Sequence, residues 1–469
     1  MDPLKTIPVN FVGAESKSRS RFWSSQSTVN LYIDLQGSGR TPTGLLPWPG
    51  EKIFSSGAPG TTRGMSLHNN KVYLIVDTSL IEIDSDGNRT TIGAIPGTGR
   101  CSLDTDGTNL VIRNGIKTYF YSTSLAEITD ADLENAQTLC YINNQFIYQG
   151  TSQRFGVANA GDPTTIDGLN YATAESYPDD IVQVYAFNER VYIGGSRSLE
   201  IWYNSGEGSP PFDRIQQSTT EIGVASPFSM ANSDEYLYFL GDDDVVYRVS
   251  AYQPESVTPS SIAKELRESV TSDAQGYSVQ LDGQHFYIVQ LPTANKTLAY
   301  SEQTGEWIRL STGTDLTFPR HLMNGYVYAF GKHLICDYDS GDVYEWDFDT
   351  YTSNGSTIIR QRDLAPVNGL QLGAPGKRLI MSRAEVIMET GVGNTSVPDP
   401  EIMISSSIDG GRSFTNEDWL KIGREGESVK RVEWYNMQGF YDVVLRVRVS
   451  DPCFTGFHSA AIDVKEAGW

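Results

Sequence analysis

Three consecutive aspartates, Asp242, Asp243 and Asp244, form the longest unbroken run of carboxylates in this sequence. Neighbouring carboxylates can bind Ca²⁺ or Mg²⁺, or act as general acids and bases. The run lies between YLYFLG and VVYRVS, two short segments of β-forming residues, and a Gly-Asp pair at such a join is typical of a hairpin turn. The flanks therefore favour a structural turn over a metal site, and recurrence of the same design elsewhere would support the turn.

Other acidic residues invite comparison with sugar-cleaving enzymes, which use two carboxylates about 5–10 Å apart. Candidate pairs are Asp179–Asp180, Asp347–Asp349 and Glu417–Asp418. A chain so rich in Asp and Glu contains such pairs by chance. The segment SIDGGRSF, Ser407–Phe414, also fits the Asp-box pattern S-x-D-x-G-x-[ST]-[WF] of sialidase propellers. Sialidases carry several such boxes and an arginine triad, whereas this chain has a single box, so a structural turn is again favoured.

The remaining chemistry-bearing residues are scattered along the chain. The five histidines do not cluster in sequence, and the segment GAPGKR, Gly373–Arg378, lacks the spacing of a phosphate-binding loop. The four cysteines contain no CxxC pair, which favours reduced thiols over a zinc site. These cysteines are Cys101, Cys140, Cys336 and Cys453. The sequence therefore predicts no catalytic, cofactor-binding or metal-binding residues, and we do not expect an enzyme.

A repeated pattern supplies the elements that would position these residues. Each unit has a polar turn, a strand, a short turn and a second strand, and units follow one another at roughly 40–50 residues, the period of four-stranded propeller blades. The units begin at Asn69, Asp106, Ile142, Phe187, Asp234, Asp282 and Asn324. The pattern predicts an all-β fold with a β-propeller of about seven blades over residues 51–350, with six blades as the alternative. The three aspartates fall between two strands of one unit, as a turn would.

The flanking regions lack this repeat. Residues 1–50, rich in Ser, Pro and Gly, are interpreted as an extended N-terminal arm that crosses other subunits or docks on the propeller. Residues 351–469 show alternating strands separated by Gly and Asp turns, which predicts a C-terminal β-sandwich. Arg446 and Arg448 alternate with apolar residues in its last part, so that strand should have one buried and one charged face. A short amphipathic helix with a serine cap is predicted over Ser260–Ser269.

A basic run in the arm is the candidate site. Lys17, Arg19 and Arg21 stand together in an otherwise acidic protein and are followed by Phe22 and Trp23. Two interpretations remain open for them, a solvated loop and a contact with an acidic partner. We predict these five residues as partner contacts.

Composition limits the classes of function. The 469 residues carry a net charge of −22, which argues against wrapping DNA by phosphate neutralisation but not against DNA passing nearby. The 44 glycines, 25 tyrosines and 18 phenylalanines suit an all-β protein. Apolar runs fall short of the roughly 20 residues of a membrane helix, so no membrane insertion is expected. The start, MDPLKTIPVNFVG, has no hydrophobic signal-peptide region, and we expect synthesis in the cytoplasm.

Several segments occur in the order seen in one known family. They include QSTVNLYIDL, LLPWPGEKIF, IPGTGRCSLDTDG, SRSLEIWYNSGEGSPPFDRI, GDDDVVYRVSAYQPESV and SSSIDGGRSF. The chain resembles the phage packaged-DNA stabilisation proteins, which are tail hub and head-completion proteins of short-tailed phages. The resemblance runs from about Pro8 to Asp463.

This resemblance implies a structural virion protein of the phage tail, made in the host cytoplasm. It implies a homo-oligomer of six copies below the portal and its adaptor ring. Such a tail hub or nozzle would extend the DNA channel, retain packaged DNA, and support the needle, fibres or tailspikes during ejection. DNA would pass without sequence-specific binding, and no cofactor is implied. The alternatives are a propeller-type glycosidase or sialidase-like tail enzyme acting on host surface polysaccharide, and a cellular propeller scaffold.

Overall fold

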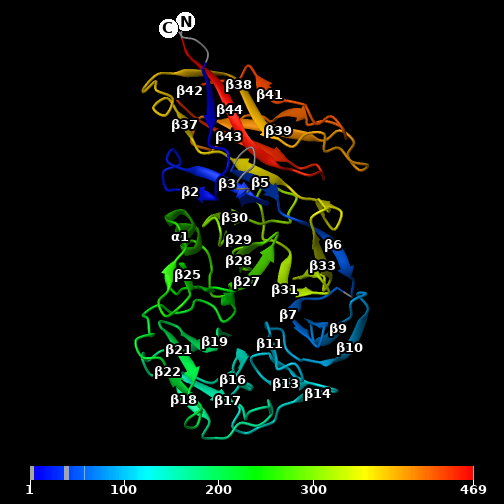
Figure 1. The fold of residues 1–469 in the computed structure, drawn as a ribbon, viewed down its shortest axis with the longest axis vertical. Helices are drawn as coiled ribbons and strands as arrows, with labels where there is room; N and C mark the ends of the chain where they lie inside the picture. The colour runs from blue at the N-terminus through cyan, green and yellow to red at the C-terminus, as the bar shows by residue number, and fades with distance from the viewer. Residues whose placement is uncertain (1–4, 36–41, 58, 468–469) are drawn as a thin grey trace.

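The computed structural model describes residues 5–35, 42–57 and 59–467, which form a propeller and a sandwich stacked end to end (Figure 1). The first and last described strands pair with each other at the sandwich end of the molecule. The described residues are almost entirely strands, turns and loops, with one α-helix among them. No described helix is long and apolar enough to span a membrane. The predicted all-β fold, a propeller followed by a C-terminal sandwich, is confirmed.

Among the described residues the propeller comprises seven four-stranded blades around a central channel. Five blades are separate sheets. Their strands are β7 (Thr62–His68), β8 (Lys71–Val76), β9 (Ser79–Ile83) and β10 (Arg89–Ala94); β11 (Ser102–Thr105), β12 (Leu110–Arg113), β13 (Thr118–Tyr121) and β14 (Leu125–Glu127); β15 (Leu139–Ile142), β16 (Gln145–Gln149), β17 (Arg154–Val157) and β18 (Tyr171–Thr173); β19 (Ile181–Phe187), β20 (Arg190–Gly195), β21 (Leu199–Asn204) and β22 (Phe212–Arg214); β23 (Ala231–Asn232), β24 (Leu237–Leu240), β25 (Val246–Val249) and β26 (Glu255–Ser256).

The last two blades are parts of larger sheets. The sixth contains β27 (Gln275–Leu281), β28 (Gln284–Leu291), β29 (Lys296–Ser301) and β30 (Trp307–Arg309). The seventh contains β31 (Met323–Ala329), β32 (Lys332–Asp337), β33 (Val343–Asp347) and, as its outer strand, β6 (Gly50–Ser55). Because β6 precedes the first blade in sequence and completes the last, it closes the ring. Two short strands, β34 (Thr352–Ser353) and β35 (Ser356–Thr357), extend this sheet beyond β6.

The repeat seen in the sequence arises from the turn between the first and second strands of a blade. Several of these turns have two residues with positive φ, as in Asn69–Asn70, Asn143–Asn144, Asn188–Glu189 and Asp282–Gly283. Two successive positive φ values define the type I′ hairpin turn, which Asn, Asp and Gly accommodate with little strain. The polar pair before each strand is therefore the local signal that sets the blade register.

The sandwich has two sheets that enclose one apolar core. One sheet contains β4 (Leu31–Leu35), β5 (Thr43–Pro47), β44 (Phe457–Glu466), β38 (Leu379–Met388) and β41 (Val432–Tyr435), with β1 (Lys5–Val9) on β44 and β42 (Gly439–Phe440) on β38. The other contains β3 (Ser25–Val29), β36 (Arg360–Asp363), β43 (Asp442–Val449), β39 (Glu401–Ser407) and β40 (Asp418–Lys421), with β2 (Ser16–Lys17) on β3 and β37 (Val367–Asn368) on β43.

Strand β3 joins the two units into one hydrogen-bonded sheet. It pairs in parallel with β30 of the sixth blade and antiparallel with β36 of the sandwich. The described part of the predicted N-terminal arm therefore lies on its own chain, in both sandwich sheets and against the propeller. Residues 1–4 and 36–41 of that arm lie outside the described residues.

Helix α1 (Ser260–Arg267) lies between the fifth and sixth blades, as predicted, but ends two residues earlier than expected. Its N-cap is Pro259, with no side-chain capping bond, so the predicted serine cap is wrong. Ile262 and Leu266 are buried among the aromatic side chains of the two neighbouring blades. Val270 follows the helix and is 46% exposed.

Candidate functional site

The three aspartates of the opening run are turn-forming residues. They lie between β24 and β25, and each carboxylate accepts a hydrogen bond from a different residue. Asp242 accepts a hydrogen bond from the Gly223 amide at 2.8 Å, and Asp243 accepts one from the Tyr247 hydroxyl at 2.6 Å. Asp244, at φ +61°, accepts one from the Thr271 hydroxyl at 3.0 Å. The three carboxylates point to different partners, and no group of three potential metal ligands occurs among the described residues.

The Asp-box segment is a hairpin turn in the sandwich, as its sequence predicts. The Asp409 carboxylate accepts bonds from the Ser413 and Ser407 hydroxyls and from the Arg412 and Ser413 amides. These bonds, first those of Ser413 and Ser407, hold the pKa of Asp409 well below its usual range. Gly410 and Gly411 lie against the turn that carries Arg21. The segment therefore packs on the N-terminal hairpin.

All five predicted contact residues lie on that hairpin, formed by β2 and β3. Lys17 is on β2, and the other four are in the turn that follows. The turn is closed by backbone bonds from Ser18 to Ser24 at 3.0 Å and from Trp23 to Ser20 at 2.9 Å. Trp23 is 84% exposed and Phe22 47%. The structure thus brings the five residues together at the junction of the two units.

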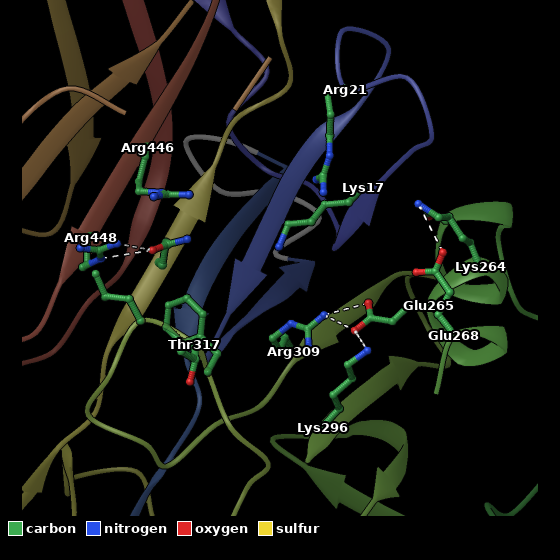
Figure 2. A pocket seen from close by; sticks show the side chains of 14 residues that line it. Lys17, Arg21, Lys264, Glu265, Glu268, Lys296, Arg309, Thr317, Arg446 and Arg448 are labelled. Carbon is green, nitrogen blue, oxygen red and sulfur yellow. Dashed lines mark hydrogen bonds and ion pairs between the residues drawn. The ribbon is translucent and has the colours of Figure 1, made fainter. Parts of the chain in front are cut away.

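Beside the hairpin is a pocket of about 380 Å³ that is rich in basic side chains. Figure 2 shows side chains converging on it from the hairpin, from α1 and from the sandwich. Half of the 14 lining residues are basic. They are Lys17, Arg21, Lys264, Lys296, Arg309, Arg446 and Arg448. The described residues that line the pocket include two acidic ones, Glu265 and Glu268.

Ion pairs fix the cations on the propeller side. Arg309 binds both oxygens of Glu265, at 2.7 and 2.8 Å, and Lys296 lies 3.3 Å from the same carboxylate. Below them, Glu15 is 1% exposed and lies 3.1 Å from Lys17 and 3.5 Å from Arg309. Burial alone would raise the pKa of Glu15, but the two cations and a bond from the Ser27 hydroxyl lower it to about 2. Glu15 is therefore ionised and holds β2 against blade six.

The sandwich side is equally ordered. Arg446 binds Asp363 through two bonds of 2.7 and 2.8 Å, and its guanidinium lies 3.5 Å from the centre of the Phe414 ring. Arg448 donates to Gln361 at 2.7 and 3.1 Å and forms an ion pair with Glu417. The predicted charged face of β43 is therefore the sandwich wall of the pocket.

A second pocket of about 620 Å³ adjoins the first on the outside of the hairpin. Trp23 and Arg19 line it together with Pro259 and Arg267 at the two ends of α1. It shares Lys264 with the cationic pocket, so the two form one continuous surface, which we call the junction site.

Four of the five residues predicted as partner contacts, all except Phe22, line the junction site, and its other lining residues were not predicted. Lys264 and Arg267 were visible in the amphipathic helix, and Arg446 and Arg448 in the alternating strand. Nothing local in the sequence indicated that these elements meet, because they are brought together by pairings between segments far apart in the chain, such as Ser27 with Asp363.

Comparison with known proteins now identifies the fold family. The family model described as "Bacteriophage P22 Gp10, beta-propeller" matches residues 5–351, and "Bacteriophage P22 Gp10, beta-sandwich" matches residues 371–465. The chain belongs to the bacteriophage P22 Gp10 family. This is a family of phage virion proteins concerned with DNA stabilisation, which confirms the resemblance seen in the sequence. Its members are structural proteins that assemble with other virion components.

Solved structures match parts of the chain at low identity. A streptogramin B lyase is 11% identical with a TM-score of 0.43, and the match covers 63% of this chain and 96% of that one. The N-terminal domain of Nup159 is 11% identical with a TM-score of 0.42, covering 69% and 99%. Similarity at this level carries no functional argument. No curated protein matches the chain.

Proposed function

We propose that this protein is a tail hub or nozzle component of a short-tailed phage. In this role it extends the DNA channel below the portal and its adaptor ring, retains packaged DNA, and supports the distal tail parts during ejection. The observation that carries the proposal is the family match, which covers both the propeller and the sandwich.

The architecture supports a mechanical role. A retaining component must transmit the force of packaged DNA without separating into its parts. Strand β3 continues the sixth blade directly into the sandwich, so pulling the units apart requires breaking backbone hydrogen bonds. Strand β6 closes the propeller ring in the same way. Both features suit a rigid element that holds its shape under load.

We further propose that six copies form a ring on the portal–adaptor complex, with needle, fibres or tailspikes below. The protein would be made in the host cytoplasm and act in the virion tail. The glycosidase alternative has less support, because the Asp-box carboxylate of Asp409 is fully occupied in its own turn. Asp347 and Asp349 likewise belong to a local turn, in which Asp347 accepts the Asp349 amide.

Particles assembled without the protein test the proposal. They should fill with DNA and then lose it, and adding purified protein after filling should restore retention. Particles that keep their genome without the protein would contradict the retaining role. Hydrolysis of host polysaccharide by the purified protein, at about 1 per second or more, would favour the enzyme instead.

A further inference from the structure

The junction site concentrates positive charge in a protein of net charge −22. Its deepest cations are rigidly placed, since Arg309 is 10% and Arg448 8% exposed and both are held by carboxylates or amides. Side chains fixed in this way lose little conformational freedom when a ligand arrives. The walls of the pocket are therefore preorganised for an anionic group.

Two cations at the rim have donors to spare. Among the described residues no ion pair joins Arg21 to a carboxylate, and Lys264 reaches only the exposed Glu268 at 3.8 Å. Such a long pair between exposed groups is weak. Arg21 and Lys264 both line the pocket, Arg21 from the hairpin and Lys264 from α1 (Figure 2). An anion between them would gain a direct partner on each side.

An aromatic surface lies next to this charge. Trp23 presents most of its ring to solvent beside Pro259, in the pocket that shares Lys264 with the cationic one. Exposed tryptophan close to arginine is the composition typical of the residues that dominate protein interfaces. A ligand for the whole site therefore combines a carboxylate with an apolar side chain.

We propose that the junction site binds an acidic peptide segment of another virion protein. A carboxylate of that segment enters between Arg21 and Lys264, and a neighbouring apolar side chain packs on Trp23. This proposal rests on the proposed function for the identity of the partner as a virion component. A duplex fits less well, because it presents phosphates on a convex surface, whereas these cations lie in a concave pocket with Glu265 among them.

Binding of synthetic peptides to the full-length protein tests the proposal. The probe is a panel of short fluorescein-labelled peptides in which glutamates flank one leucine or tryptophan. Each has a counterpart in which glutamine replaces every glutamate. At least one glutamate peptide should bind about tenfold more tightly than its counterpart, measured by fluorescence anisotropy. Equal binding of the two, or no binding by any peptide, would overturn the proposal.

Variants locate the binding. Arg21→Gln combined with Lys264→Gln should lower the affinity for the glutamate peptide by about tenfold or more. Trp23→Ala should weaken it too, and bound peptide should protect Trp23 from iodide quenching. Arg197→Gln, in an exposed turn of the fourth blade, is the matched control and should leave the affinity unchanged. Binding that survives the double substitution would show that the peptide sits elsewhere.

Two further readouts separate the possible failures. A labelled DNA duplex that binds, and loses affinity in the same double variant while the peptides do not bind, would assign the site to nucleic acid. If particles that lack the protein leak DNA but the purified protein binds no acidic peptide, this inference is overturned and the proposed function stands. If the protein binds the acidic peptide but particles that lack it retain their DNA, the proposed function is overturned and peptide binding at the junction site stands.

Discussion

At the scale of single residues, the inner wall of the propeller contains a carboxyl group in an unfavourable place. Asp104 is on β11 and lines the central channel, where its oxygens accept the Tyr141 and Thr105 amides. Burial raises its pKa from 3.8 to about 6, because the charged form loses hydration that two amide bonds only partly replace. The folded protein therefore binds this proton more tightly than the unfolded chain does.

A pH-dependent stability difference follows for Asp104→Asn. Well below pH 3.8 the aspartate is neutral in both states, so it contributes no pH dependence. As pH rises from 4 to 6 the folded state holds the proton longer, and wild-type stability falls relative to the variant. By pH 7 the difference in the free energy of unfolding between the two proteins should have shifted by about 2 kcal/mol in favour of the variant. Urea unfolding of both proteins at pH 4 and pH 7 measures this difference. Asp86→Asn, in an exposed turn, is the control. A difference in unfolding free energy that does not change with pH would contradict the raised pKa of Asp104.

The aspartate run allows a second prediction at this scale. Asparagine keeps a side-chain acceptor, so replacing Asp242, Asp243 and Asp244 together by asparagine should cost little stability. Asp243→Ala should cost about 1 kcal/mol, because the Tyr247 hydroxyl loses its 2.6 Å acceptor. Thermal midpoints of the three proteins, each with Ca²⁺ and with a chelator, provide the measurement. A midpoint that Ca²⁺ raises in the wild type but not in the triple variant would reveal a metal site after all.

At the scale of elements, one buried arginine holds the N-terminal segment in place. Arg362 on β36 is fully buried, and burial lowers its pKa to about 10. It donates to the Phe11 carbonyl at 2.7 Å, the Ala14 carbonyl at 3.1 Å and the Thr28 hydroxyl at 2.9 Å. A single side chain thus satisfies backbone groups that precede the hairpin, which explains why the segment before β2 has a fixed path.

Replacing this side chain should release the hairpin. Arg362→Met leaves the Phe11 and Ala14 carbonyls without their donor, and the loss of hydrogen bonds to a charged donor costs about 1.5–3 kcal/mol. Trypsin should then cut faster at Lys17, Arg19 or Arg21, as followed by mass spectrometry of the fragments. Arg362→Lys, which keeps the charge but not the planar donor array, should behave similarly. Unchanged cleavage in Arg362→Met, with Arg197→Met as the surface control, would show that the strand pairings alone hold the segment.

The same elements show what a sequence can and cannot predict. The blades were predictable because each is built from neighbouring strands whose turns, such as Asn69–Asn70, have a local signature. The position of β3 was not, since its partners β30 and β36 lie some 280 to 330 residues away. Contacts at that separation leave no periodic trace in the chain. The five hairpin residues were therefore identifiable as unusual, but the helix and strand that complete their pocket were not.

At the scale of the whole molecule, charge is distributed unevenly. The chain carries 36 basic and 58 acidic residues, and many of the basic ones gather at the junction site, where Glu15, Glu265 and Asp363 partly neutralise them. Cations collected there are missing from other surfaces, which are correspondingly more acidic. In the proposed role as a channel component, such a surface would repel the phosphates of passing DNA and give them few fixed binding points.

Affinity for free duplex DNA tests this distribution. The purified protein should bind a duplex no more tightly than the roughly 10⁻⁴ to 10⁻⁶ M of non-specific binders. Because few counterions are released, the affinity should also change little between about 50 and 200 mM salt, whereas proteins that contact many phosphates lose about a thousandfold or more. Arg21→Glu combined with Lys264→Glu should leave this weak affinity nearly unchanged, since a concave pair cannot follow a duplex. Titrations by fluorescence anisotropy at several salt concentrations measure both quantities. A steep salt dependence that the double variant abolishes would mean that the junction site contacts DNA, and that the acidic surface is not what governs passage.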